Sequence, residues 1–266
     1  RNYLNITAKE SFIEEPVITL RPEQEAAVEQ TQKVFKKKDR MLWNAKMRFG
    51  KTLTSLQLVK NEAFQRVLIM THRPVVADSW FDDFKKMKMS ADGYDYGSVN
   101  QGETLENLKR GEKPFVYFAS IQLLRYNGGQ TNLKDFADVD WDLIIVDEAH
   151  EGTQTELSDT VMKELVKEHT KILELSGTPF NLLDQFDEEQ VYTWDYVMEQ
   201  QAKKKWELER PSEPNPYETL PKVSMYTFEM KHKERFSDES KSFNFREFFR
   251  VAEDGKLVYK QEVRQF

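Results

Sequence analysis

Two segments of the chain carry residue types that together could bind and split a nucleoside triphosphate. The first is the run Gly50–Thr52, which reads Gly-Lys-Thr, and the second is the pair Asp147-Glu148, which follows the apolar run Leu143–Val146. A Gly-Lys-Thr turn can hold phosphates, and an Asp-Glu pair at a strand end can hold a magnesium ion and polarise a water molecule. The two segments therefore supply both halves of a nucleoside-triphosphate site.

Each residue of the first segment has a separate physical task. Gly50 lets backbone amides approach a phosphate, Lys51 places a point charge near the β and γ phosphates, and the Thr52 hydroxyl can ligate magnesium at a helix start that favours anions. We expect the nucleotide to contact the loop residues Arg48, Phe49, Gly50, Lys51, Thr52 and Leu53. A surface turn can carry Gly-Lys-Thr by coincidence, but the acidic pair downstream favours a phosphate site.

The two carboxylates of the second segment divide the remaining chemistry. Asp147 can hold magnesium together with Thr52, while Glu148 can orient and deprotonate the water that attacks the γ phosphate. An acidic, solvated strand end is the alternative explanation for the pair. We therefore predict Lys51, Asp147 and Glu148 as catalytic residues, with Thr52 and Asp147 as the magnesium ligands.

These groups need a sheet that presents them at one edge, and the apolar runs predict such a sheet. Buried strands are expected at residues 41–44, 66–70, 115–119, 143–146 and 171–175, with one helix at residues 20–35 and another beginning near residue 53. Short apolar runs separated by helical or turn-rich segments are typical of a parallel sheet covered on both faces. The predicted fold is therefore α/β and doubly wound, with helices on both faces of the sheet.

Composition changes after residue 180. Nine of the ten glycines precede this point, and residues 211–221 contain four prolines, which predicts an extended connector. A helix is expected at residues 193–205, an alternating strand at 223–230 and a short aromatic helix at 243–251. We therefore divide the chain into an N-terminal extension (1–19), an α/β domain (20–182) and a mixed C-terminal extension (183–266).

The overall composition narrows the class of protein. A net charge of -7 argues against a polycationic nucleic-acid coat, although it leaves room for a local basic groove. The chain has no cysteine, which excludes disulfides and thiol catalysis. Its apolar runs are too short to cross a bilayer. We therefore expect a cytoplasmic protein with no membrane partner. The first residue is Arg1 rather than methionine, so we expect a piece of a longer polypeptide. Four tryptophans are expected in the core or in interfaces: Trp80, Trp141, Trp194 and Trp206.

Three runs resemble the motifs of superfamily 2 helicases and translocases. Asp147–His150, which reads Asp-Glu-Ala-His, and Ser176–Pro179, which reads Ser-Gly-Thr-Pro, resemble motifs II and III, and Ala45–Thr52 resembles motif I, with Arg48 where many members have glycine. The resemblance implies a RecA-like first motor domain that uses ATP and Mg²⁺. It also implies a set of residues that couple the nucleotide state to the grip on nucleic acid, namely His150, Ser176 and Thr178.

Further segments are similar to superfamily elements that contact the base and the nucleic acid. In Leu20–Gln24, the resemblance implies that Arg21 and Gln24 contact the nucleotide, with two hydrogen bonds between Gln24 and adenine N6 and N7, although a polar first helical turn is the alternative. The segments after the strands at 66–70 and 115–119 occupy the positions of the strand-tracking motifs. The nucleic-acid contacts implied there are Thr71, Arg73, Ser120 and Gln122. For Arg73, a loop salt bridge explains the residue equally well.

Softer matches at residues 177–181, 192–196 and 215–221 resemble the restriction-subunit branch, which includes type III restriction enzymes and related DNA-dependent ATPases. This branch implies duplex DNA, a second RecA-like domain of the same polypeptide, and methylase or nuclease modules as partners. No Gln-x-x-Gly-Arg-x-Gly-Arg-like element follows Phe180, so we expect this chain alone to bind nucleotide weakly and to turn over slowly or not at all. An RNA-directed helicase, a nucleotide-binding scaffold subunit and a phosphotransferase remain as alternatives.

Overall fold

Seven parallel strands form the sheet of the computed structural model, which describes residues 18–72, 76–125, 133–149, 156–220, 248–252 and 256–259. The strands are β1 (Arg40–Ala45), β2 (Arg66–Thr71), β3 (Asp95–Ser98), β4 (Phe115–Ser120), β5 (Leu143–Asp147), β6 (Lys171–Ser176) and β7 (Val191–Trp194). Their order is β3-β4-β2-β5-β6-β1-β7, and every neighbouring pair is parallel. Because parallel strands all end at the same edge, the loops that follow them gather there.

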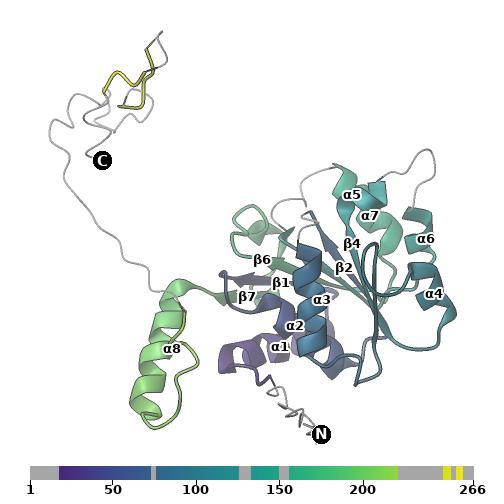
Figure 1. Ribbon diagram of the computed structural model, residues 1–266, viewed down its shortest axis with the longest axis horizontal. Helices are drawn as coiled ribbons and strands as arrows, with labels where there is room; N and C mark the ends of the chain where they lie inside the picture. The colour runs from purple at the N-terminus through teal and green to yellow at the C-terminus, as the bar shows by residue number, and fades with distance from the viewer. Residues whose placement is uncertain are drawn as a thin grey trace, which may run out of the picture. The chain divides into compact units, whose positions relative to one another are not determined.

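Helices cover both faces of this sheet (Figure 1). The first apolar cluster joins the sheet to α1 (Pro22–Phe35), α2 (Lys51–Glu62) and α3 (Ala77–Lys86). The second cluster joins the opposite face to α4 (Leu105–Arg110), α5 (Ile121–Arg125), α6 (Leu133–Ala137) and α7 (Glu156–Leu165). Two 3-10 turns, Leu183–Gln185 and Glu188–Gln190, precede β7, and α8 (Tyr196–Glu209) follows it.

Side chains that alternate along each strand separate the two clusters. In β1, Met41 and Trp43 belong to the α1–α3 side, whereas Leu42 between them belongs to the α4–α7 side, and all three are fully buried. A strand that is covered on both faces is a continuous apolar run, which is why the sequence reveals it. The predicted α/β, doubly wound fold with helices on both faces is confirmed.

The two edge strands, β3 and β7, are missing from the sequence prediction. Each has only four residues, and an edge strand needs no continuous apolar run because it has a strand neighbour on one side only. The predicted helix start at residue 193 is wrong. The Asp195 side chain accepts the Met198 N–H at 2.8 Å and so begins α8 at Tyr196, which leaves Thr193 and Trp194 in β7.

The first of two compact units extends from Arg1 to Leu220, so the structure that contains the sheet continues past residue 182. The second unit is Pro221–Phe266, and little of it is described. There, Val251 forms an antiparallel bridge with Leu257, so the aromatic helix predicted at 243–251 does not reach Val251. Phe248 is helical, and residues 243–247 of that predicted helix, like the strand predicted at 223–230, lie outside the described residues.

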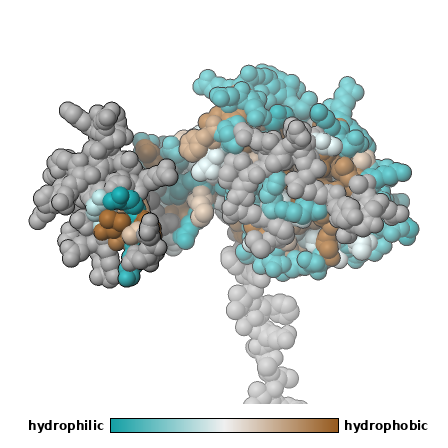
Figure 2. Space-filling view, turned by 90° about the horizontal axis from the view of Figure 1, so that it is seen from above, coloured by the Kyte–Doolittle hydropathy of each residue, from teal (hydrophilic) through white to brown (hydrophobic). Residues whose placement is uncertain are grey.

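The surface seen in Figure 2 is mostly hydrophilic where residues are described, with scattered apolar patches. Exposed apolar side chains include Met47 and Phe180, at 79% and 82% exposure. Among the helices of the described ranges, none combines the length and the apolar character that crossing a bilayer requires.

Candidate nucleotide site

The carboxyl ends of adjacent strands bring most of the predicted site residues to one edge of the sheet. Thr71 at the end of β2 pairs with Asp147 at the end of β5 and with Ser120 at the end of β4. Beyond β5, Ser176 at the end of β6 pairs with Asn44 in β1. The loop that contains Gly50–Thr52, called below the predicted phosphate loop, follows β1, and the predicted acidic pair ends β5. Both therefore lie at the same edge, with only β6 between their strands.

The loop between β1 and α2 has a backbone shape that glycine usually provides. Arg48 and Gly50 have φ angles of +68° and +88°, both in the left-handed region. A residue other than glycine costs about 1–2 kcal/mol in this conformation. The loop is anchored by Phe49, which is fully buried and has its ring against those of Trp43 and Tyr192. Arg48 thus adopts a conformation that glycine favours, at the position where many members of the superfamily have glycine.

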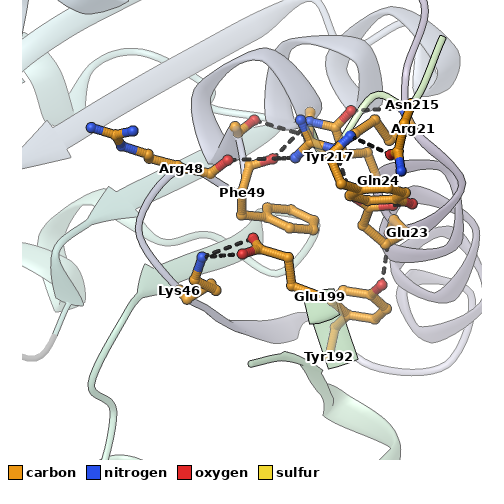
Figure 3. Close-up of polar contacts among 12 residues, drawn as sticks. Arg21, Glu23, Gln24, Lys46, Arg48, Phe49, Tyr192, Glu199, Asn215 and Tyr217 are labelled. Carbon is orange, nitrogen blue, oxygen red and sulfur yellow. Dashed lines mark hydrogen bonds and ion pairs between the residues drawn. The ribbon is translucent and has the colours of Figure 1, made fainter. Parts of the chain in front are cut away.

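Helix α1 holds this loop through the carbonyl oxygen of Phe49 (Figure 3). Arg21 Nη2 and Gln24 Nε2 both donate to that oxygen, each at 2.7 Å. Because a trans peptide directs its C=O and N–H to opposite sides, the Gly50 N–H points away from these two donors. Gln24 is buried, and its Oε1 accepts the Arg21 N–H at 2.8 Å. Arg21 and Gln24 therefore fix the orientation of the Phe49–Gly50 peptide in the predicted phosphate loop, a contact with no sequence signal.

The other side of the loop is held by β7 and α8. The Lys46 N–H donates to the Trp194 carbonyl at 3.0 Å, and the Lys46 ammonium lies 2.8 and 2.7 Å from the two carboxylate oxygens of Glu199. The Glu199 side chain is only 1% exposed, so this ion pair is shielded from water. Figure 3 shows the Glu199 carboxylate facing Lys46. Sequence reasoning misses Glu199 because one glutamate in a helix rich in charged residues is expected to be solvated.

Lys51 interacts electrostatically with the acidic pair. Its Nζ donates to the Ala45 carbonyl at 2.8 Å. Burial lowers the pKa of Lys51, and the charges of Glu148 and Asp147 act in the opposite direction. Burial likewise raises the pKa of Asp147, and the hydrogen bond from Trp80 and the charge of Lys51 oppose that rise. The lysine and both carboxylates therefore share one electrostatic environment.

Both carboxylate oxygens of Asp147 accept hydrogen bonds from the protein. Oδ1 accepts the Glu148 N–H at 3.0 Å, and Oδ2 accepts the indole N–H of Trp80, in α3, at 3.1 Å. Glu148 has a φ of +53°, an uncommon conformation that clusters at functional sites when it occurs outside glycine. Sequence reasoning assigns Trp80 to the core, and it is buried there, but the contact with Asp147 has no sequence signal.

Oxygen donors at this edge fit a magnesium ion. Thr52 follows Lys51 in the first turn of α2 and carries a hydroxyl, and Asp147 carries a carboxylate. Magnesium is a hard cation that prefers oxygen ligands, and in nucleotide sites one or two protein groups usually hold it together with the phosphates. The next predicted loop residue, Leu53, packs against the apolar core of the α1–α3 side.

The predicted coupling residues lie at the end of β6. Ser176 is fully buried, and its Oγ accepts the N–H of Thr178 at 3.2 Å. The side chain of Thr178 is exposed at the sheet edge. His150, the third predicted coupling residue, lies outside the described residues, as does Arg73 of the predicted nucleic-acid contacts.

The other residues predicted to contact nucleic acid differ in their solvent exposure. Thr71 is fully buried, so its hydroxyl is not presented to a phosphate in this structure. Ser120 is partly buried, and its Oγ accepts the Leu123 N–H at 3.3 Å. Gln122 is exposed at the start of α5 and donates to the His72 carbonyl at 3.0 Å.

Comparison with known families gives one matching model, described as the res subunit of type III restriction enzymes, over residues 17–181. That range includes the phosphate loop, the acidic pair and the segment after β6. A curated relative is the C-terminus of RM.MpnORF110P from Mycoplasma pneumoniae (strain ATCC 29342 / M129 / Subtype 1), whose name describes a type II restriction enzyme and methyltransferase. It is 28% identical over 283 aligned residues, which cover 85% of this chain and 39% of the relative. The chain therefore spans well under half of that protein.

Two solved structures are similar to this chain. The SWI2/SNF2 ATPase core of Sulfolobus solfataricus, in complex with double-stranded DNA, has a TM-score of 0.50 at 21% identity and covers 66% of this chain and 35% of that one. The UvsW helicase from bacteriophage T4 has a TM-score of 0.47 at 16% identity, over 66% of this chain and 61% of that one. The likeness to the ATPase core confirms the RecA-like α/β fold that the sequence predicts.

Proposed function

The chain belongs to the type III restriction enzyme res-subunit family and forms a RecA-like domain of a superfamily 2 helicase-type motor, and on this premise we propose that it hydrolyses ATP to drive movement along DNA. It acts as the first of two motor domains in its polypeptide. The observation that carries the proposal is the placement of Lys51, Asp147 and Glu148 at one edge of the sheet, after two strands that have only β6 between them. This grouping offers one bound triphosphate a cation for its phosphates and carboxylates for metal binding and water activation.

Each site residue has a defined task. The amides of the loop and the N-terminus of α2 bind the phosphates, and Lys51 turns from its carbonyl partner in β1 toward the β and γ phosphates. Thr52 and Asp147 hold Mg²⁺, which when bound neutralises charge on the phosphate oxygens. Glu148 orients the attacking water and accepts its proton.

Gln24 is suited to bind adenine while it holds the loop. Its carbonyl oxygen has a second lone pair and its amide nitrogen a second hydrogen, besides those already bonded to Arg21 and Phe49. One acceptor and one donor are what adenine N6 and N7 require. Adenine binding and the orientation of the Gly50 amide therefore depend on the same side chain.

DNA is the proposed track, since the relative at 28% identity is named as a restriction enzyme and methyltransferase. Loops at the sheet edge contact backbone phosphates through Arg73, Ser120 and Gln122, whereas the buried Thr71 hydroxyl takes no part in this contact. His150, Ser176 and Thr178 pass the nucleotide state to these loops. Methylase or nuclease modules act with the motor, as the name of that relative suggests.

The second motor domain docks over the same edge. Met47 and Phe180 are 79% and 82% exposed, and they belong to the loops that follow the neighbouring strands β1 and β6. Exposed apolar side chains beside a functional site favour a protein partner there. That partner supplies the arginine that completes the site for γ-phosphate transfer.

ATP hydrolysis by the full polypeptide, with duplex DNA, single-stranded DNA or RNA present, tests the proposal. We expect duplex DNA to stimulate turnover most. Glu148→Gln should lower turnover at least about 100-fold and leave nucleotide binding intact, because it removes the general base. Lys51→Ala should weaken nucleotide binding itself. Glu168→Gln, a matched change of an exposed glutamate, should leave both unchanged.

Three outcomes would overturn parts of this assignment. If Glu148→Gln kept normal turnover, Glu148 would not be the general base. If the full polypeptide bound nucleotide without any turnover, the chain would use nucleotide as a structural ligand, as a scaffold subunit does. If RNA stimulated turnover more than duplex DNA, the track would be RNA. The 266 residues alone should turn over slowly or not at all, and robust stimulated turnover by them would argue against the need for a second motor domain.

A further inference from the structure

Trp80 contacts the acidic pair although it lies far from both site segments in the sequence. It sits in α3, is 1% exposed and packs in the apolar cluster between α1–α3 and the sheet. Its one polar atom, the indole Nε1, donates to Asp147 Oδ2 at 3.1 Å. The indole N–H is a donor only, so this bond uses all the hydrogen-bonding capacity of the side chain.

The bond fixes the direction of the Asp147 carboxylate. Oδ1 is held by the Glu148 N–H at 3.0 Å and Oδ2 by Trp80, so each oxygen has one donor from the protein. Two donors on two oxygens prevent the carboxylate from rotating about its last bond. Because an ionised carboxylate has about four lone-pair sites, each oxygen keeps room for a metal ion or its water.

We propose that Trp80 is a positioning residue, which holds Asp147 in the orientation that magnesium binding needs. This inference rests on the proposed role of Asp147 as a magnesium ligand. Magnesium demands near-octahedral geometry, so it is sensitive to the direction of each ligand. Trp80 is rigid because it is buried, which makes it a better guide for the carboxylate than an exposed, flexible donor.

Trp80→Phe in the full polypeptide removes the N–H and keeps an aromatic ring. The readout is the binding of a fluorescent ADP analogue titrated with Mg²⁺, which does not depend on turnover. Loss of a group that orients a metal ligand usually costs about 10–100-fold in metal affinity. We therefore expect at least about a 10-fold weaker apparent Mg²⁺ affinity, with unchanged nucleotide binding when Mg²⁺ is absent.

Trp141→Phe is the matched control. Trp141 is also fully buried, and its indole N–H donates to the Phe136 carbonyl at 2.9 Å, in the cluster on the other face of the sheet. Both variants lose a buried indole hydrogen bond, so both should lose thermal stability. Only the Trp80 variant should change the Mg²⁺ dependence.

A double-mutant cycle with Asp147→Asn identifies the partner through which Trp80 acts. If Trp80 works through Asp147, Trp80→Phe should add nothing further to the loss of Mg²⁺ dependence in the Asp147→Asn background. Equal effects of Trp80→Phe in both backgrounds, or an effect no larger than that of Trp141→Phe, would overturn the proposal. If Trp80→Phe does not fold, benzothienylalanine at position 80 serves instead, since it keeps the bicyclic shape and lacks the N–H.

The same measurements separate this inference from the proposed function. If Lys51→Ala and Asp147→Asn both leave Mg²⁺-dependent binding unchanged, the nucleotide site itself is wrong. If those two variants abolish it and Trp80→Phe behaves like Trp141→Phe, only the positioning role is wrong.

Discussion

Breaking the ion pair between Lys46 and Glu199 tests how far α8 stabilises the phosphate loop. Lys46→Met removes the ammonium and keeps a long side chain, so the two oxygens of Glu199 lose the cation that lies 2.8 and 2.7 Å from them. Glu199 remains buried, because the α8 backbone around it is unchanged. The variant therefore leaves a buried carboxylate without the cation that stabilises it.

The expected loss of stability follows from the burial of the Lys46 and Glu199 side chains. Removing one partner of a buried pair costs about 3–5 kcal/mol, since the remaining charge is uncompensated. The Lys46 side chain is 21% exposed, against 1% for Glu199, so some water can reach the vacated space. We therefore take the lower end, about 3 kcal/mol. For a domain of this size each kcal/mol shifts Tm by roughly 2–4 °C, so Tm should fall by roughly 6–12 °C.

Thermal and urea unfolding at neutral pH, followed by circular dichroism, measure the loss. Lys205→Met is the matched control because Lys205 is on α8 and lies 3.9 Å from Glu209, with both side chains exposed. An exposed pair contributes little, so this control should change stability by less than about 0.5 kcal/mol. Nucleotide binding by both variants reports whether the loop needs α8 for its shape.

The double variant Lys46→Met with Glu199→Met gives the decisive comparison. Replacing both charges with apolar side chains is often neutral, so stability should return to within about 1 kcal/mol of the wild type. Two results would refute the reasoning: a loss for Lys46→Met no larger than that for Lys205→Met, or a double variant less stable than Lys46→Met alone.

Two further predictions follow from the loop and from β6. Gly50→Ala should destabilise the fold by at least about 1 kcal/mol more than Gly93→Ala. Both glycines have positive φ, but only a Cβ at Gly50 would meet a neighbour, Gln24 Nε2 at 2.6 Å. Equal losses of stability in thermal unfolding would exclude the clash. Burial raises the pKa of Glu174 and Arg40 opposes the rise, so the folded chain binds this proton at higher pH than the unfolded chain. As pH falls from above the folded-state pKa of Glu174 to its unfolded-state value of 4.5, the wild type should therefore gain stability relative to Glu174→Gln. A difference in the free energy of urea unfolding that does not change with pH would contradict this.

Much of the central sheet could be predicted from the sequence. The five strands that the apolar runs mark, β1, β2, β4, β5 and β6, are where the sequence predicts them, to within a residue or two. They are interior strands with both faces buried, so nearly every residue must be apolar. The edge strands β3 and β7 escape prediction because a short edge strand can be built from residues such as Asp95 and Gly97.

The candidate site divides in the same way. Gly50, Lys51, Asp147 and Glu148 could be selected from sequence because their residue types directly follow predicted strands, and parallel strands end at one edge. The left-handed backbone conformation of Arg48 could not be predicted from the sequence, because an arginine side chain does not indicate a positive φ.

The sequence by itself therefore determined the five interior strands and the residue types that follow them, because the apolar runs and the spacing of motif residues are local properties of the chain. Only the tertiary structure decided which distant side chains complete the site: Trp80 at Asp147, and Glu199 at Lys46. These contacts join segments separated by many residues, so they depend on how helices pack on the sheet. A buried tryptophan N–H and a buried carboxylate each need a hydrogen-bond partner. Which residue is that partner depends on the fold, because only the fold brings the two groups within hydrogen-bonding distance.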